Sequence, residues 1–230
     1  MLSREIAIQV HKLGKRFGTH WVLRGASFDV SRGEVAAIMG ANGSGKSTLL
    51  RILATLLRPN AGTAQVDGFD VMHDASHVRR SVGYLAHVPG LYEDLTAHEN
   101  LRFAADMLGL PSSAVETSLD RVGLSHAGEM RVRGFSAGMQ RRLALARLVI
   151  RRPHILLLDE PYSNLDGDGI GLMNSVIRDV LDAGGAALLA LHELAPARGI
   201  LDRTLHLSAG RIATGKHDYV GSETTSMVTA

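Results

Sequence analysis

The chain has 230 residues, a net charge of +2 and no cysteine, a composition that suits a reducing compartment. This length can bury a sizeable core as one large domain or two small ones, and without a dense basic stripe we expect no nucleic-acid partner. No apolar run approaches the ~20 residues of a membrane-spanning helix, so we expect a soluble chain without direct membrane insertion.

Two β-rich segments open the chain. Residues 6–10 alternate between apolar and polar side chains, and residues 21–30 continue in the same style with a break at Gly25. They predict a small antiparallel layer packed on the core. Phe17 lies between the two segments, where its ring could stack on an adenine or belong to the core, and position alone leaves both interpretations open.

A glycine-rich loop follows a short apolar run. Residues 35–39 predict a buried strand, and apolar residues from Leu49 onward recur at helical spacing. The residues between fit the phosphate-loop pattern: Gly40, Ala41, Asn42, Gly43, Ser44, Gly45, Lys46, Ser47 and Thr48. We expect the backbone to cradle the phosphates of ATP, with Lys46 on the β- and γ-phosphates and the Ser47 hydroxyl on Mg²⁺. An ordinary glycine-rich turn is the alternative, and the flanking strand and helix argue against it.

The middle of the chain reads as helical. Strands are predicted at 63–68 and 82–86, and a capping-box pattern at Thr96–Glu99 then starts a helix. A second helix is expected over 111–122, and Ser136 is a candidate N-cap for a third over 139–150. The arginine pairs at 141–142 and 151–152 are interpreted as a solvated helix face. We expect one domain over 1–230, with a helical subdomain at about 89–152 inserted in its nucleotide-binding core.

Sheet character returns after this block. A fully apolar run at 155–158 ends in Asp159 and Glu160, a helix is predicted over 169–183, and a further strand at 186–191 ends at His192. Strands that are apolar throughout, without alternation of apolar and polar residues, are typical of a central parallel sheet. A closing hairpin is expected between 204 and 213, and residues 221–230 are expected to fray. The predicted fold class is α/β, a phosphate-loop core with a mostly parallel sheet, an N-terminal antiparallel layer and an inserted helical subdomain.

Polar side chains at the strand ends are candidates for catalysis. Asp159 could hold Mg²⁺, Glu160 could polarise the attacking water, and His192 could bond a γ-phosphate oxygen. The plainer alternatives are solvated acids and a structural histidine, and the neighbouring phosphate loop favours the catalytic interpretation. His73 and His77 stand four residues apart but have no evident third ligand, so they are not interpreted as a metal site.

Several motifs together resemble one family. Phe-Ser-Ala-Gly-Met-Gln at 135–140 resembles the signature loop of ATP-binding-cassette (ABC) ATPases, and residues 163–166 look like their D-loop. His192 then matches the family's switch histidine, and Phe17 its adenine-stacking aromatic. The resemblance implies a head-to-tail dimer closed over two ATP molecules, in which Ser136 and Gly138 of one subunit touch the γ-phosphate held by the other. It also implies integral-membrane partner subunits that contact the loop near His87 and the helical block. The chain would then be cytoplasmic, on the inner face of the cell membrane.

Two positions depart from the family pattern, and three longer segments resemble one subgroup of the family. His87 replaces a Gln that senses Mg²⁺ and the attacking water, and Met139 stands where many members carry Gln. Residues 84–91, 95–101 and 135–148 are similar to the ATPase subunit that exports haem for cytochrome c maturation. We therefore expect an ATPase that powers an exporter, with haem as one candidate cargo and drugs or lipids as others. One alternative is a non-transport ABC ATPase of DNA repair or translation. Such a protein usually carries a long coiled-coil insertion or two fused cassettes, and this chain has neither. Another alternative, a phosphate-loop kinase or GTPase, would not account for the motif at 135–140.

Overall fold

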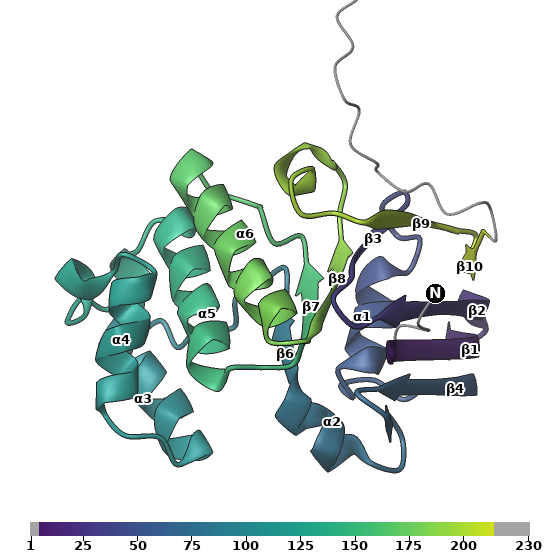
Figure 1. Cartoon of the computed structure of the whole chain (residues 1–230), viewed down its shortest axis with the longest axis horizontal. Coiled ribbons are helices and arrows are strands. Elements are labelled where there is room, and N and C mark those ends of the chain that lie inside the picture. The colour runs from purple at the N-terminus through teal and green to yellow at the C-terminus, as the bar shows by residue number, and fades with distance from the viewer. Residues whose placement is uncertain (1–4, 214–230) are drawn as a thin grey trace, which may run out of the picture.

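The computed structural model describes residues 5–213, so the expected fraying at 221–230 lies outside the described residues. Figure 1 shows a central sheet flanked by an antiparallel β layer at one end of the molecule and a block of helices at the other. Within 5–213, no helix is both long and apolar enough to cross a membrane.

The antiparallel layer is longer than the sequence predicted. It contains β1 (Ile6–Phe17), β2 (His20–Ser31), β4 (Ala61–Val66) and β5 (Phe69–Asp70), in the order β2-β1-β4-β5. Neither β5 nor the short helix α2 (Ala75–Ser81) was predicted, because β5 has only two residues and α2 is short and mostly polar. Phe17 ends β1 and is 50% exposed, which contradicts the alternative that its ring belongs to the core.

The central sheet confirms the predicted mostly parallel arrangement. Its strands are β3 (Val35–Met39), β6 (Val82–Leu85), β7 (Ile155–Asp159), β8 (Ala186–Ala190), β9 (Arg203–Ser208) and β10 (Arg211–Ile212), in the order β10-β9-β3-β8-β7-β6. All neighbours are parallel except β10, which pairs antiparallel with β9 as the expected hairpin. The carboxyl ends of β3, β6, β7 and β8 therefore meet at one edge, where open α/β sheets bind ligands.

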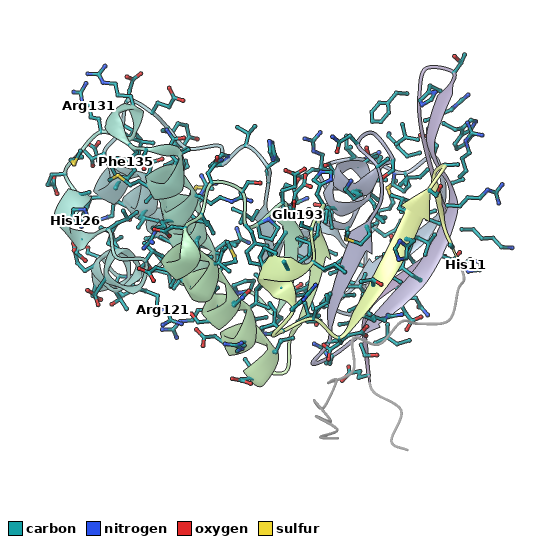
Figure 2. All side chains as sticks on the ribbon, turned by 90° about the horizontal axis from the view of Figure 1, so that it is seen from above. His11, Arg121, His126, Arg131, Phe135 and Glu193 are labelled. Carbon is teal, nitrogen blue, oxygen red and sulfur yellow. The ribbon has the colours of Figure 1, made fainter. Side chains whose placement is uncertain are left out.

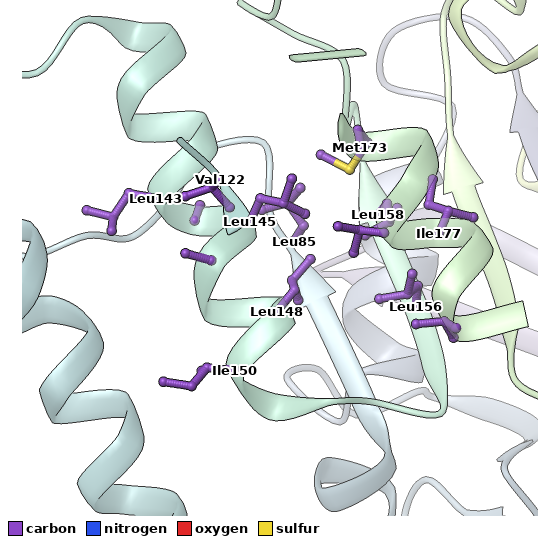
Figure 3. Close-up of a cluster of buried hydrophobic side chains, with 14 of the residues drawn as sticks. Leu85, Val122, Leu143, Leu145, Leu148, Ile150, Leu156, Leu158, Met173 and Ile177 are labelled. Carbon is purple, nitrogen blue, oxygen red and sulfur yellow. The ribbon is translucent and has the colours of Figure 1, made fainter. Parts of the chain in front are cut away.

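Helices cover both faces of this sheet, which explains why its strands are apolar throughout. In β7, Leu156 and Leu158 belong to a core shared with α5 (Ala137–Arg151) and α6 (Gly167–Asp182), as Figure 3 shows. The alternate residues Ile155 and Leu157 belong to a second core, shared with α1 (Lys46–Leu53) and the antiparallel layer. Successive side chains of a strand point to opposite faces of the sheet, so β7 packs against α5 and α6 on one face and against α1 on the other.

The helical block contains α3 (Ala97–Leu108) and α4 (Ser113–Arg121), followed by two short 3₁₀ turns and then α5. Thr96 caps α3 by accepting a hydrogen bond from Glu99 N at 3.0 Å, and the Glu99 side chain completes the predicted capping box. Ser136 caps α5 by accepting from Met139 N at 3.2 Å. Each cap satisfies a donor that the first turn of a helix leaves unpaired. The proposed subdomain limits of about 89 and 152 stay a prediction.

Candidate functional site

The phosphate-loop segment connects β3 to α1, and close backbone packing shapes it. A Cβ at Gly40 would lie 2.3 Å from the carbonyl oxygen of Leu207 in β9, so only glycine fits there. Gly45 is the N-cap of α1 at φ +109°, a conformation that other residues rarely adopt. No side chain caps α1, in contrast to α3, α5 and α6. Its first-turn N–H groups are therefore available to an anion such as a nucleotide phosphate.

Lys46 is folded over this loop. Its Nζ donates hydrogen bonds to the carbonyl oxygens of Gly40 at 2.7 Å and Ala41 at 3.2 Å, and its side chain is buried. The ammonium group is thus held among the backbone groups that would surround a phosphate. Of the other predicted loop residues, Ala41, Asn42 and Gly43 are exposed, whereas Ser44, Ser47 and Thr48 are partly buried.

Asp159 provides the test of whether this site suits Mg²⁺. Asp159 as a residue is 2% exposed, and within the described chain its carboxylate oxygen Oδ2 is buried without a hydrogen-bond partner. A buried carboxylate oxygen without a partner is costly, and a hard cation would satisfy it. No group of three or more His, Asp or Glu side chains in residues 5–213 is arranged to hold a metal by itself. The residues thus fit a cation that takes its remaining ligands from the Ser47 hydroxyl and phosphate oxygens.

Glu160 follows β7 directly, and two histidines surround its carboxylate. His192 Nε2 donates to Oε1 at 2.8 Å, and His87 Nδ1 lies 3.0 Å from Oε2. Ser163 Oγ donates to Oε2 at 3.4 Å. The structure thus brings together three residues that the sequence placed at three different strand ends. It puts His87 on the carboxylate, and its predicted metal-sensing role stays a prediction.

The histidines also tune the acidity of Glu160. Partial burial raises the pKa of its carboxyl group, but the hydrogen bond from His192 and the charges of His87 and His192 outweigh this. The net pKa lies below the usual value for glutamate. Glu160 is therefore a carboxylate at neutral pH, able to accept a hydrogen bond from a water molecule and orient it.

Arg141 corrects the sequence interpretation of a solvated arginine face. Its side chain is 2% exposed and donates only to main-chain carbonyl groups among its hydrogen bonds in the structure. The prediction was wrong because Arg141 lies on the apolar stripe of α5, at helical spacing from Ala144, Leu145 and Leu148. That spacing was the available signal. Its neighbour Arg142 is partly exposed and pairs with Asp166 at 3.0 Å.

The predicted signature residues lie in a different place. Ser136 and Gly138 line a surface hollow with Asn164 and Asp166, and none of its lining residues belongs to the phosphate loop. A Cβ at Gly138 would lie 3.1 Å from the Asn164 carbonyl oxygen, so glycine allows this close approach. Figure 2 shows Phe135, next to Ser136, at the helical end of the molecule, and Glu193, next to His192, near its middle. The predicted signature loop therefore forms a second surface, separate from the sheet edge that carries Glu160 and His192.

Phe17 has an exposed ring, with Lys15 Nζ 5.1 Å from the ring centroid. The β1–β2 hairpin that carries it reaches the phosphate loop, because a Cβ at Gly45 would lie 3.0 Å from Leu23 Cδ2. An exposed aromatic on this hairpin suits an adenine base, and the stacking role stays a prediction.

Comparison with known proteins gives one consistent family. Residues 23–163 match the family model described as ABC transporter. The chain is 44% identical over 188 residues to the cytochrome c biogenesis ATP-binding export protein CcmA of Xanthomonas oryzae pv. oryzae, which covers 79% of this chain and 85% of that protein. It is 37% identical over 225 residues to the daunorubicin resistance ATP-binding protein DrrA3 of Streptomyces coeruleorubidus, which covers 96% and 71%.

Solved structures agree in fold. An ATP-binding subunit of an ABC transporter superposes with a TM-score of 0.82 at 30% identity, covering 90% of this chain and 88% of that one. A dimeric ATP-binding cassette in a post-hydrolysis state, bound to ADP and Pi, also gives a TM-score of 0.82, at 22% identity and with coverage of 94% and 99%. The second likeness, at that identity, is one of fold.

Proposed function

Because the chain belongs to the ABC transporter family of ATP-binding proteins, we propose that it hydrolyses ATP to power an exporter that serves cytochrome c maturation, with haem as cargo. The observation that carries the hydrolytic part is the position of Glu160. Its carboxylate stands at the sheet edge where the phosphate loop begins, and His192 and His87 hold both of its oxygens.

The residues divide the chemistry between them. The loop amides and Lys46 bind the phosphates, and Glu160 holds a water molecule in line with the γ-phosphorus and accepts its proton. The water oxygen forms a bond to phosphorus as the bond to the β-phosphate oxygen breaks, and ADP leaves with that electron pair. Mg²⁺, held by Ser47 and Asp159, would neutralise charge on the β- and γ-phosphates. The ring N–H of His192 donates a hydrogen bond. It can therefore hold either a γ-phosphate oxygen or the Glu160 carboxylate in position.

Catalysis in this proposal needs two chains. Ser136 and Gly138 lie in a hollow without phosphate-loop residues, so one chain cannot easily bring them to its own nucleotide. A second chain packed head to tail would place them on the γ-phosphate held by the first. The Ser136 hydroxyl and the first-turn amides of α5 would then complete the anion site.

The membrane partner would contact a groove between the central sheet and the helical block. Tyr92, Phe103 and Met107 line it, with the two rings packed edge to face and Met107 75% exposed. Exposed apolar side chains gathered in a groove are typical of a protein interface. Through this contact the chain would lie on the inner face of the cell membrane.

Drug export is the second candidate, because the drug-resistance relative DrrA3 matches over 96% of this chain. The two candidates share the same ATPase chemistry and differ in the membrane subunits and their cargo.

A deletion strain separates these possibilities. With haem export, loss of the gene should abolish covalent haem on c-type cytochromes, measured by peroxidase staining of denaturing gels. Wild-type chain should restore the stain, whereas Lys46→Ala should not, because it loses ATP binding. Normal staining together with lost drug tolerance would favour drug export. Lack of Mg²⁺-dependent ATP hydrolysis by the chain together with its membrane subunits would contradict the ATPase itself.

A further inference from the structure

Arg141 lies on the buried side of α5 and donates hydrogen bonds to main-chain carbonyl groups of two other segments. Its guanidinium donates to Asp159 O at 3.0 Å, to Pro161 O at 3.1 Å, and to Glu160 O. It also donates to Ala86 O at 2.8 Å and to His87 O at 3.4 Å. These carbonyls lie at the last residue of β7, just after β7 and just after β6, so one side chain joins both strand ends.

The same side chain joins those ends to α5. Arg141 lies five residues after Ser136, the N-cap of this helix. The helix is rigid over that distance, so Arg141 mechanically links the signature hollow to the residues around the γ-phosphate. Among the arginines of the described chain, Arg141 is the least exposed residue.

Packing does not explain why an arginine occupies this position. Arg141 falls on the apolar stripe of α5, where leucine would extend the core without bringing a charge inside. Burial lowers the pKa of the Arg141 guanidinium to about 10, against the raising influence of the Asp159 and Glu160 carboxylates, so it stays charged at neutral pH. What arginine supplies, and leucine cannot, is a planar fork of five donors.

The segment it holds is conformationally unusual. Glu160 has φ +49°, a left-handed conformation that persists only where its surroundings fix it. Its N–H donates to Ala190 O at 3.0 Å, and its carbonyl accepts from Arg141 and from Ser163 N at 3.2 Å in the turn that follows. The N–H is therefore fixed by β8, and the carbonyl by the local turn and by Arg141 of α5, which is its only contact to a distant segment among the hydrogen bonds of the described residues.

We propose that Arg141 is a positioning residue for hydrolysis, which fixes Glu160 and His87 relative to each other and to the signature end of α5. The inference rests on the proposed ATPase function. In this role Arg141 acts on the placement of the water-orienting carboxylate and leaves the phosphate loop untouched, since none of its partners lies in residues 40–48.

The test compares Arg141→Met with Arg121→Met, a control that removes an exposed arginine bonded to Asp179 and Ser175 between α4 and α6. A small displacement of a reacting group costs about 100-fold in rate, so kcat of Arg141→Met should fall by that order. The equilibrium affinity for ATP should stay within about threefold of the wild-type value, because the substitution leaves the phosphate loop unchanged. The control should keep both values.

A double variant distinguishes positioning from general stability. If Arg141 acts through Glu160, adding Arg141→Met to Glu160→Gln should lower kcat no further, because the carboxylate it positions is already gone. Multiplying losses would overturn the proposal, as would a wild-type kcat in Arg141→Met or a matching loss of ATP affinity. If Arg141→Met does not fold, Arg141→Lys carries the test, because it keeps the charge without the fork and should give a reduced kcat at unchanged affinity.

The two proposals fail differently. A wild-type protein without Mg²⁺-dependent hydrolysis overturns the proposed function. A hydrolysing wild type with an equally active Arg141→Lys and Arg141→Met overturns the role of Arg141 alone.

Discussion

His192 and Glu160 are 32 residues apart in the chain, yet His192 Nε2 lies 2.8 Å from Glu160 Oε1. The parallel pairing of β7 and β8 brings them together, since each residue emerges from the carboxyl end of its strand. The register extends one step past β7, where Glu160 N donates to Ala190 O. The pair is therefore a product of sheet topology and needs no long flexible loop.

Replacing the carboxylate should separate binding from turnover. Glu160→Gln keeps an acceptor for His192 but loses the negative charge that orients water, so we expect kcat to fall by about 10²–10⁴ while ATP still binds. The variant should accumulate as an ATP-bound dimer on size-exclusion chromatography. Glu116→Gln, which changes an exposed glutamate beside His98, is the control. Turnover at the wild-type rate would defeat the role assigned to Glu160.

The signature surface is tested by Ser136→Arg. A bulky cation in the hollow should block the head-to-tail dimer and abolish hydrolysis, while the monomer still binds ATP at its own phosphate loop. The change also removes the cap of α5, which costs about 1 kcal/mol of stability. Thr96→Ala removes the equivalent cap of α3 and serves as the matched control. If Ser136→Arg hydrolyses ATP as the control does, the dimer model is wrong.

The departure at His87 is tested by two substitutions. If His87 helps to sense the metal or to hold Glu160 from 3.0 Å, His87→Gln should retain ATPase activity and its coupling to transport better than His87→Ala, because the amide can still donate. Activity is measured against Mg²⁺ concentration in both variants. Equal behaviour would mean that His87 is only a spacer.

A buried ion pair away from the site gives a stability prediction. Arg203 Nε bonds to Glu34 Oε1, and both side chains are almost fully buried, which ties the turn before β3 to β9. Arg203→Met removes the cationic partner of the buried Glu34 carboxylate, which keeps the hydrogen bond from Ser31 N at 2.7 Å, and should lower the free energy of unfolding by about 3–5 kcal/mol. Urea denaturation measures this. Arg102→Met breaks an exposed pair with Asp106 and should cost about 0–1 kcal/mol. Equal losses would refute the distinction.

Asp166 should make stability depend on acid pH. Its pKa is lowered from the usual 3.8, first by the hydrogen bond from Gly169 N and then by Arg142. A lowered folded-state pKa contributes stability above the usual value and loses it as pH falls through the folded-state pKa. Asp166→Asn keeps a capping side chain but has no charge to lose. The urea midpoints of the two proteins should therefore converge as the pH is lowered from about 5 to below 3.8. A constant difference over that range would contradict the assignment.

The sequence predicted those features that depend on short local sequence patterns. The strand, glycine loop and helix around Lys46 appear where expected, as do the caps at Thr96 and Ser136. The apolar strand that ends at Asp159 also placed Glu160 at the correct edge of the sheet. These features depend on neighbouring residues or on the parallel pairing rule, so a single sequence carries them.

Contacts between distant segments could not be predicted in this way. The bonds from Arg141 to carbonyls of residues 86–87 and 159–161 depend on how α5 packs over two strands. The pairing of Glu34 with Arg203 joins residues 169 positions apart. In both cases the sequence shows only a charged residue, and a charged residue is by default a solvated one.

The pairing of β3 sets how much of the chain must be synthesised before the central sheet can close. The strand that leads into the phosphate loop has β8 and β9 as neighbours, and these strands begin at Ala186 and Arg203. A ribosome must therefore translate most of the chain before either edge of β3 is covered, and such long-range pairing closes slowly. Until then we expect the nascent chain to expose an unpaired apolar strand, which makes it prone to aggregation. We therefore expect ATP to bind only after most of the chain has been synthesised and the central sheet has formed. ATP binding would then report complete folding.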